Sequence, residues 1–391
     1  MKEVVRLTPA DDVQIRAACH LVTVAFGGFE GRLEAYRREV EQCEVLAVLD
    51  GGQVAGVASL RPYRQWFAGR ELAMTGLGGV AVAAHARRRG VAGTLLAAGL
   101  ERMRVGGTPV STLYPSSPPV YRASGWEVAG VVASFELPTI GLPSGLSGEV
   151  TLRALDREAP DEADLASVHT LYTAAARDAV GPLTRVGVLF DQTRLTNRDA
   201  VVIAAADGVD AGYVTWSRRS HPGGDRLEVQ ELIADRPSVR DALLGAVGSW
   251  QTTIATARIR WGDPIAAAFA APRGFILKEE SWMLRVVDAA EAVAGRGFGP
   301  VEGAVDLVLT DQKAPWQEGR WRLAVANGAG TLTRGGSGEV QLHTRGLAAL
   351  FTGYAGAGSL ARAGLADGPP AALRRLSGLF AGPAPWMLDE F

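Results

Sequence analysis

The chain has 391 residues, of which 47% are hydrophobic and 21% are charged, and its formal net charge is −2. This length exceeds what one hydrophobic core supports, so we expect two or three domains. The near-neutral charge argues against a nucleic-acid partner, which requires a basic face. No apolar run reaches membrane-spanning length, and the N-terminus lacks a signal-peptide core. The sequence therefore predicts a cytoplasmic protein with no membrane partner.

Cysteine and histidine usage narrows the chemistry further. Cys19 and Cys43 are too few for a disulfide framework and indicate a reducing compartment. The histidines are scattered, and none stands at metal-ligand spacing from another ligand: His20, His85, His169, His221 and His343. We therefore predict no metal site.

The first part of the chain alternates strands and helices. Strands are predicted at Val4–Leu7, Val45–Leu49, Val54–Arg61, Leu72–Val82, Val110–Tyr114 and Trp126–Leu137. Helices are predicted from a cap at Asp11 or Asp12 to about Phe26, over about Arg32–Gln42, after the glycine-rich turn that precedes Leu95, and over Pro118–Ala123. Asp50-Gly51 reads as a hairpin turn within this antiparallel meander.

The most informative segment is the strand, turn and helix of residues 78–102. A short strand with Val80 and Val82 leads into a basic turn in which Arg87, Gly90 and Ala92 fit the pattern R-x-x-G-x-G/A. Such a turn places free backbone N–H groups at a helix N-terminus beside three arginines, which suits a pyrophosphate. The predicted cofactor residues are Val80, Ala81, Val82, Arg87, Arg88, Arg89, Gly90, Val91, Ala92 and Gly93.

This turn has two other interpretations. An ordinary strand–loop–helix with a solvated arginine cluster would look similar. A dinucleotide site is less favoured, because the G-x-G-x-x-G spacing is absent.

The middle of the chain repeats the first part in outline. Residues 137–148 form a Pro/Gly/Ser linker, and the strands and helices that follow come in a similar order. The segment that corresponds to the basic turn reads Asp235-Arg236-Pro237-Ser238-Val239-Arg240-Asp241. Its glycines are gone, Pro237 has no N–H to offer, and the aspartates would repel a phosphate. We expect this degenerate copy to bind no cofactor and to have an architectural role.

The last part of the chain predicts a small α+β domain. Gly295–Gly299 reads as a boundary, and period-two alternation after it indicates strands around Val305, Trp321 and Val340. Arg345–Phe351 and Pro369–Phe380 read as helices. The predicted domains span residues 1–140, 149–290 and 299–391.

The strand, turn and helix at Val80–Gly93 resemble the acetyl-CoA site of the GCN5-related N-acetyltransferases (GNAT). The layout of the whole chain resembles the Eis (enhanced intracellular survival) family, in which a catalytic GNAT domain precedes a degenerate GNAT copy and a sterol-carrier-like domain. The other points of likeness are Tyr114-Pro115 through Gly125-Trp126, Ala314-Pro315-Trp316 with Gly319-Arg320-Trp321-Arg322-Leu323, and the terminus Trp386-Met387-Leu388-Asp389-Glu390-Phe391.

The resemblance implies a function as well as a fold. It implies direct transfer of an acetyl group from acetyl-CoA to a small-molecule amine, aminoglycosides among them, by a homo-hexamer without a metal. In the family a tyrosine at the position of Tyr121 protonates the departing thiolate, and the terminal carboxylate, here that of Phe391, acts as a base on the amine. A phenol pKa of about 10 is close enough to a thiol's roughly 8.5 for this transfer.

Each of these residues also has a structural interpretation. Tyr121 would then pack beside Trp126, and Tyr114 is a rival that more simply ends a strand. Phe391 would then only fasten the third domain to its neighbours. The acceptor site is predicted at Phe26, Phe29, Glu30 and Trp66, of which the aromatic residues would equally serve in a core. Glu390, beside the terminal carboxylate, would add negative charge for a cationic acceptor. The glycines in Phe26-Gly27-Gly28-Phe29 replace an acidic pocket residue of a familiar member, which puts aminoglycosides in doubt.

Two alternative functions remain open at this point. One keeps the chemistry but changes the acceptor to a protein lysine or a polyamine. The other is a lipid-binding protein that uses the third domain and carries a vestigial acetyltransferase. The intact turn at Arg87–Gly93 argues against the second alternative, because the degenerate copy shows how such a turn decays.

Overall fold

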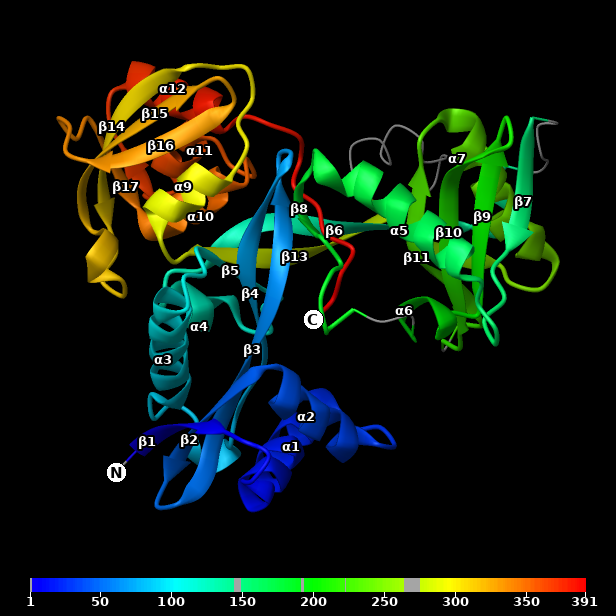
Figure 1. The fold of residues 1–391 in the computed structure, drawn as a ribbon, viewed down its shortest axis with the longest axis horizontal. Helices are drawn as coiled ribbons and strands as arrows, with labels where there is room; N and C mark the ends of the chain where they lie inside the picture. Colours follow the sequence, from blue (N-terminus) through cyan, green and yellow to red (C-terminus); the bar gives the residue numbers. More distant parts are fainter. Residues whose placement is uncertain (1, 144–148, 191–192, 222, 264–274) are drawn as a thin grey trace.

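The computed structural model describes residues 2–143, 149–190, 193–221, 223–263 and 275–391. Three lobes surround a long, upright hairpin, and the end of the chain lies at the centre, beside that hairpin (Figure 1). Within the described residues, no helix combines the length and the apolar character needed to cross a membrane.

The first lobe contains the elements predicted from the sequence. They are β1 (Lys2–Leu7), α1 (Asp12–Phe26), α2 (Arg32–Gln42), β2 (Glu44–Asp50), β3 (Gln53–Phe67), β4 (Arg70–Val82), α3 (Val91–Val105), β5 (Val110–Leu113), α4 (Pro118–Arg122) and β6 (Glu127–Pro138). The predicted cap of α1 is wrong in detail. The Asp11 carboxylate accepts the Thr8 N–H at 2.7 Å and bonds no amide of the helix.

The second lobe has the same kind of order. It contains β7 (Val150–Ala154), α5 (Glu162–Arg177), β8 (Val180–Leu183), α6 (Thr193–Thr196), β9 (Ala200–Ala206), β10 (Val209–Arg219), β11 (Arg226–Ala234), α7 (Pro237–Gly248), β12 (Thr256–Arg260) and β13 (Ile276–Val286). Helix α7 begins at Pro237, within the segment that corresponds to the basic turn of the first lobe.

The first two lobes share one 13-stranded sheet. Its order is β1-β2-β3-β4-β5-β13-β6-β12-β11-β10-β9-β7, and β8 pairs with β3. Strand β13, the last of the second lobe, lies between β5 and β6 of the first, and β6 also pairs with β12. The sequence predicted β6 as the final strand of a separate domain. Instead, each lobe completes its sheet with a strand of the other.

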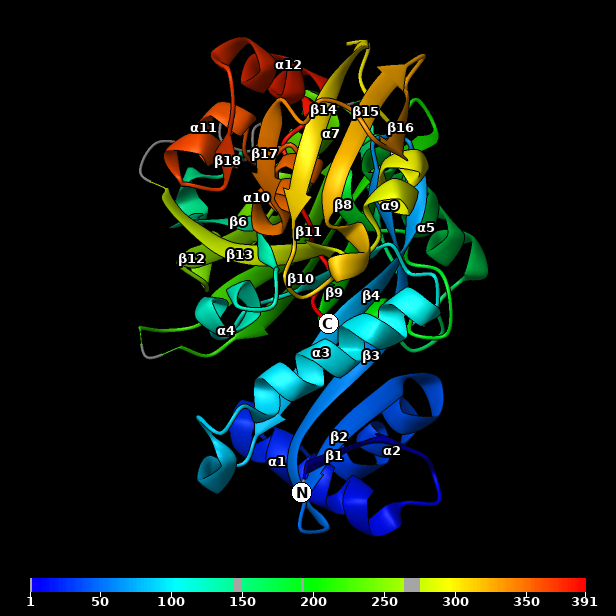
Figure 2. The same ribbon diagram turned by 90° about the vertical axis from the view of Figure 1, so that its left-hand side faces the viewer.

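In the first lobe, helices cover both faces of the β1–β4 region of this sheet. Val45, Ala47 and Val57 face α1 and α2 in one cluster. Leu46, Ala58, Leu60 and Leu77 face α3 in another. Figure 2 shows α3 crossing one face of the β3–β4 hairpin. Side chains alternate between the two layers along each strand, and register shifts in β3 and β4 offset this alternation. Ala55 and Leu77 therefore pack in the α3 cluster, whereas Val57 and Ala81 pack in the cluster of α1 and α2.

The third lobe is a five-stranded sheet covered by helices. It contains α9 (Ala289–Gly295), β14 (Gly303–Thr310), β15 (Gly319–Ala326), β16 (Ala329–Arg334), β17 (Val340–His343), α10 (Thr344–Phe351), α11 (Ala357–Arg362), β18 (Ala366–Asp367) and α12 (Pro370–Phe380). The strand order is β16-β15-β14-β17-β18.

After α12 the chain leaves the third lobe and returns to the shared sheet. The Trp386 N–H donates to the Val180 carbonyl at 3.0 Å, and Trp386 also bridges to Val131 of β6. We call residues 386–391 the tail. Its side chains from Trp386 to Asp389 are buried. The tail therefore joins all three lobes, as its central course in Figure 1 shows.

Candidate active site

Strands β4 and β5 separate and leave an open strand edge. They pair in parallel over three residues only, and the last pair is Gly76 with Thr112. Beyond it, within the described residues, no strand pairs with β4 on that side. On the other side, a register shift against β3 gives β4 an extra residue near Gly79, whose φ is +59°. The bulge and the split expose backbone groups of Val80–Val82, the kind of edge an extended chain can pair with.

The predicted pyrophosphate turn directly follows this edge. Arg88 and Gly90 adopt left-handed backbone angles with φ of +60° and +81°, and α3 begins at Val91. The first N–H groups of α3 have no acceptor within the helix and point along its positive end. Arg87, Arg88 and Arg89 are exposed, and none has an ion pair among the described residues.

The space around the turn fits a bulky anion. A Cβ placed on Gly90 or on Gly93 would meet no atom within 4 Å. The Arg87 side chain is held back toward the strand, since its Nε donates to the Val82 carbonyl at 3.3 Å. The structure thus brings together Val80–Val82 and Arg87–Gly93 along one path from β4 to α3. These residues would hold the pantetheine and pyrophosphate of acetyl-CoA.

Tyr121 lies on the short helix α4, close to the packing of α3. It is 5% exposed and belongs to the cluster that includes Leu113, Trp126 and Leu77. Burial raises the pKa of its phenol, and a hydrogen bond with Ser116 offsets part of this rise. Tyr121 therefore stays protonated at neutral pH, as a proton donor must. The packing beside Trp126 does not separate this role from a structural one.

The tail brings Phe391 to the point where β4 and β5 part. The Phe391 ring packs on Tyr63 with centroids 5.1 Å apart and edge-on against Tyr114 at 5.7 Å. A Cβ on Gly76 would lie 2.7 Å from the Tyr63 ring and 2.8 Å from the Phe391 ring. Both aromatic rings can therefore pack on β4 only because Gly76 has no side chain.

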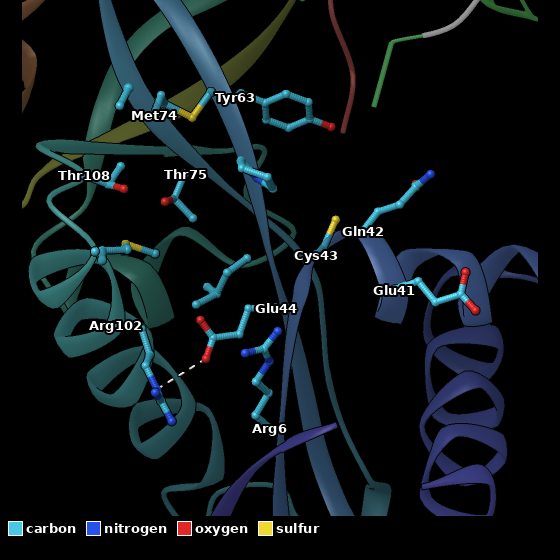
Figure 3. Close-up of a pocket in the computed structure, with 15 residues that line it drawn as sticks. Arg6, Glu41, Gln42, Cys43, Glu44, Tyr63, Met74, Thr75, Arg102 and Thr108 are labelled. Atoms are coloured by element: carbon cyan, nitrogen blue, oxygen red, sulfur yellow. Dashed lines mark ion pairs between the residues drawn. The ribbon is translucent and has the colours of Figure 1, made fainter. Parts of the chain in front are cut away.

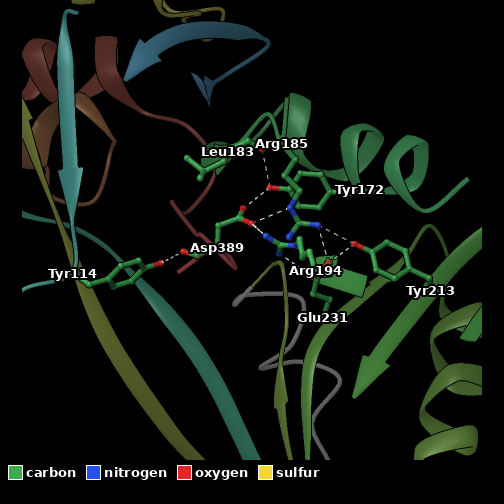
Figure 4. Close-up of polar contacts among 8 residues, drawn as sticks. All are labelled: Tyr114, Tyr172, Leu183, Arg185, Arg194, Tyr213, Glu231 and Asp389. Atoms are coloured by element: carbon green, nitrogen blue, oxygen red, sulfur yellow. Dashed lines mark hydrogen bonds and ion pairs between the residues drawn. The ribbon is translucent and has the colours of Figure 1, made fainter. Parts of the chain in front are cut away.

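A buried ionic cluster fixes the tail just before Phe391 (Figure 4). The Asp389 carboxylate accepts from the Arg185 Nε at 3.0 Å and pairs with Arg194. Glu231 of β11 accepts from Arg185 at 2.8 Å and from the Tyr213 hydroxyl at 2.6 Å, and it also pairs with Arg194. We call these side chains the tail clamp: Tyr172, Arg185, Arg194, Tyr213, Glu231 and Asp389.

In the clamp two arginines face two carboxylates, and this sets the pKa of Glu231. Burial alone would raise the pKa of Glu231, but the adjacent charges of Arg185 and Arg194 outweigh burial and hold that pKa well below its ordinary value. The Tyr172 hydroxyl lies 3.0 Å from the Asp389 carboxylate and 2.8 Å from the Leu183 carbonyl. Sequence reasoning missed the clamp, because its members are spread from residue 172 to residue 389 with no motif.

A cavity of about 300 Å³ opens beside the tail. Its lining comes from β3, from the second lobe and from the tail: Tyr63, Leu183, Leu189, Phe190, Arg194, Asn197, Arg198, Asp389 and Glu390. We call it the tail cavity. Glu390 is paired with Arg260, and its side chain is 61% exposed.

The other predicted acceptor residues lie elsewhere. Trp66 points to the face of β3 opposite Tyr63 and packs in the cluster of Tyr172 and Tyr213, so it cannot line the tail cavity beside Phe391. Phe26 and Phe29 are 53% and 58% exposed near the C-terminal end of α1, and Glu30 is exposed beside them. None of the four belongs to the lining of the tail cavity.

Sequence reasoning also missed a carboxylate on the α2 side of β4. Both the Arg61 Nε and a terminal Arg61 nitrogen donate to one oxygen of Glu39, at 2.9 and 2.6 Å. The guanidinium lies against Gly78, where a Cβ would be 2.5 Å from its nitrogen. Tyr63, two residues further along β3, shares this face with Arg61. The pair thus stands between α2 and the bulged part of β4.

A further pocket of about 320 Å³ lies at the outer edge of β3 (Figure 3). Tyr63 is at one end of it, and Arg6, Glu44 and Arg102 are at the other. Glu44 and Arg102 form an ion pair at 3.3 Å. Cys43 lines the pocket, but burial raises the pKa of its thiol to about 11, so the thiol is protonated at neutral pH. A protonated thiol is a poor nucleophile, so Cys43 gives no support for a covalent acetyl-cysteine intermediate.

The corresponding turn of the second lobe differs in its charges. Arg236 pairs with Asp235 at 2.9 Å and with Asp207 at 3.7 Å, so its cation is already neutralised. Pro237 occupies the first position of α7, where it offers no N–H. This arrangement supports the expectation that the second lobe has no cofactor role.

Comparison with known proteins identifies the chain. Acetyltransferase (GNAT) domain families match residues 6–129 and 181–286, and the sterol carrier protein domain matches residues 289–388. The crystal structure of a GCN5-related N-acetyltransferase from Kribbella flavida is 32% identical, with a TM-score of 0.86, over 100% of this chain and 98% of that one. The chain belongs to the GCN5-related N-acetyltransferases. The predicted fold class is confirmed: tandem GNAT domains followed by a sterol-carrier-like domain.

More distant relatives agree with this assignment. An uncharacterized N-acetyltransferase of Streptomyces avermitilis is 27% identical over 94% of this chain and 95% of its own length. Eis1 from Mycobacterium abscessus is 19% identical, with a TM-score of 0.77 over the full length of both chains. At that identity the likeness to Eis1 shows a common fold alone. The enzyme is an acetyltransferase, and the GNAT fold implies the use of acetyl-CoA.

Proposed function

We propose that this acetyltransferase moves an acetyl group directly from acetyl-CoA to a small-molecule amine. One observation carries the proposal. The open edge of β4 runs from the basic turn at Arg87–Gly93 to Gly76, and Phe391 covers Gly76 at the end of that path. A thioester laid along the edge would reach the tail cavity, where an amine can approach it.

In the proposed reaction the chain's own groups position the reactants and move two protons. Backbone amides of the turn and of β4 hold the pyrophosphate and the thioester oxygen. The amine nitrogen bonds to the thioester carbon, and the carbon–sulfur bond breaks. Tyr121 gives its proton to the leaving sulfur and regains one from solvent. The carboxylate of Phe391, the last residue of this sequence, assists loss of the proton from the amine.

Other features of the Eis-like interpretation are proposals of the same kind. We propose a cytoplasmic homo-hexamer with domains at 1–140, 149–290 and 299–391. Cys19 and Cys43 are free and buried, which suits a reducing compartment. Light scattering on the purified protein measures the oligomeric state.

Release of the CoA thiol in the presence of a panel of amines tests the reaction. Acetylated products identified by mass spectrometry would support the proposal. Acetyl-CoA binding without acetylation of any amine, polyamine or lysine peptide would contradict it. The same panel distinguishes small amines from polyamines and from protein lysines.

A further inference from the structure

We propose that the acceptor carries an anionic group, a carboxylate or a phosphate, in addition to its amine, and that Arg198 of the second lobe binds this group. The inference rests on the proposed function and names the class of its substrate. It also gives the degenerate GNAT copy a part in acceptor recognition.

The tail cavity is placed for this role. It lies beside Phe391's ring partner Tyr63. Its opposite wall comes from six residues of the second lobe: Leu183, Leu189, Phe190, Arg194, Asn197 and Arg198. Its volume of about 300 Å³ is at the lower end of small-molecule sites. An acceptor held there would have one end beside Tyr63, whose ring contacts Phe391, and the other end at the second lobe.

Among the described residues that line the cavity, Arg198 is the cation that has no partner. Arg194 and Asp389 belong to the tail clamp, in which two arginines face two carboxylates. Glu390 is paired with Arg260. Arg198 also lines the cavity, yet in the described part of the chain its guanidinium has neither a hydrogen bond nor an ion pair.

Arg198 is half-buried, so its charge is only partly solvated. Burial lowers the pKa of its guanidinium, and the charges of Arg194 and Arg260 act in the same direction, against the opposing charges of Glu231 and Glu390. A half-buried cation without a partner is unfavourable. An anionic ligand group would give it a charge-assisted, bidentate partner.

The same charges disfavour polycationic acceptors. A second ammonium group that reached the far wall would meet Arg198 and Arg194, and among the described lining residues both carboxylates, Asp389 and Glu390, are already paired with arginines. An acceptor whose amine lies near Phe391 and whose anion lies near Arg198 would complement both ends. The structure therefore favours amino acids and phosphorylated amines over aminoglycosides and polyamines.

Matched acceptors of one chain length test the inference. We suggest 4-aminobutanoate, 4-aminobutanamide and 1,4-diaminobutane, which differ only in the charge at the far end. Ethanolamine and O-phosphoethanolamine form the second series and separate a carboxylate from a phosphate. Thiol release at saturating acetyl-CoA gives kcat/KM for each. An acid or phosphate should exceed its neutral counterpart by about tenfold or more, the range of a hydrogen-bonded charge pair.

Substitutions then locate the effect. Arg198→Gln should remove the preference for the anion, and Arg198→Glu should transfer the preference to the diamine. Arg219→Gln is the matched control, since Arg219 is an exposed arginine of the same lobe outside the cavity lining. It should leave the preference unchanged.

Two results would overturn the inference while the proposed function stands: equal kcat/KM for all members of a series, or a preference for the anion that persists in Arg198→Gln. Calorimetry of 4-aminobutanoate and 4-aminobutanamide with CoA-bound protein repeats the comparison without turnover. It tests Arg198 even where no thiol is released, a result that would count against the proposed function instead.

Discussion

The phenol of Tyr114 donates a hydrogen bond of 2.7 Å to the main-chain carbonyl of Asp389. This bond joins the end of β5, in the catalytic half, to the tail of the third lobe. Its position just before Phe391 sets where the last aromatic ring meets Gly76. Tyr114 is thus placed to hold the tail, whereas Tyr121 remains the candidate acid.

Tyr121→Phe should lower kcat by about 10²- to 10⁴-fold, the usual contribution of a general acid, and should change the KM for acetyl-CoA little. The substitution keeps the buried ring and removes only the proton. Steady-state kinetics measured where chemistry limits the rate checks this. Unchanged turnover would leave Tyr121 with a packing role.

Tyr114→Phe is the companion experiment. It removes the bond to Asp389 and should reduce the free energy of unfolding by about 1 kcal/mol. Because it loosens the tail rather than deleting a proton donor, we expect a smaller fall in kcat than for Tyr121→Phe. Denaturant titration beside the kinetic assay separates the two effects.

Gly93→Glu should abolish acetyl-CoA binding without loss of fold. Position 93 has an ordinary helical backbone and open space for a side chain, so the change introduces no strain. A carboxylate in the first turn of α3 even suits the helix dipole. Calorimetry measures the affinity. The matched control is Ser238→Glu, at an exposed position in the first turn of α7, which should leave binding intact.

Changes at Phe391 should abolish amine acetylation and preserve acetyl-CoA binding. Deletion of Phe391 withdraws the carboxylate by one residue, and a C-terminal tag moves it away from the reaction centre, where little displacement is tolerated. Gly76→Ala should act similarly, because its Cβ would displace the Phe391 ring. Intact-mass analysis first verifies that the purified chain ends at Phe391. Full activity of a tagged protein would contradict a catalytic role for the Phe391 carboxylate and would leave the tail with a structural role alone.

The tail clamp should make stability depend on acid pH. The pKa of Glu231 is lowered in the folded protein, so the unfolded chain takes up protons first as the pH falls. The stabilisation is therefore complete above the ordinary glutamate pKa of about 4.3 and is lost progressively below it. Denaturant titrations at pH 7, 5, 4 and 3 measure this slope.

Glu231→Gln should flatten that slope and, at pH 7, lower the free energy of unfolding by about 3 kcal/mol, since it leaves buried arginine charge uncompensated. Glu158→Gln, at an exposed glutamate of the same lobe, should do neither. A slope that persists in Glu231→Gln would assign the acid sensitivity to other carboxylates.

Local patterns predicted the elements they encode. The helix predicted at Arg32–Gln42 is α2, with the same bounds, because its residues favour a helix and place Tyr36 and Val40 on one buried face. The basic turn could be predicted from its glycines and arginines, because consecutive residues determine its backbone conformation. Both signals act over less than four helical turns.

Features made by distant residues escaped prediction. Strand β8 reads Val-Gly-Pro-Leu, a poor strand sequence, and is a strand only because β3 pairs with it. Trp66 was predicted in the acceptor site because strand residues often form the wall of such a pocket; it lies on the face of β3 opposite Tyr63 and outside the lining of the tail cavity. The tail clamp and the surroundings of Arg198 depend on how the second lobe packs against the tail. No local sequence pattern predicts that packing.

The insertion of β13 between β5 and β6 also sets an order of events during synthesis. A ribosome that has released residues 1–140 has supplied every predicted cofactor residue, yet the sheet that carries them lacks a central strand until residues 276–286 emerge. Pairings of such high sequence separation form late. The first lobe must therefore wait, with the facing edges of β5 and β6 unpaired, while residues 141–275 are synthesised. The tail reaches it later still, when residues 386–391 emerge.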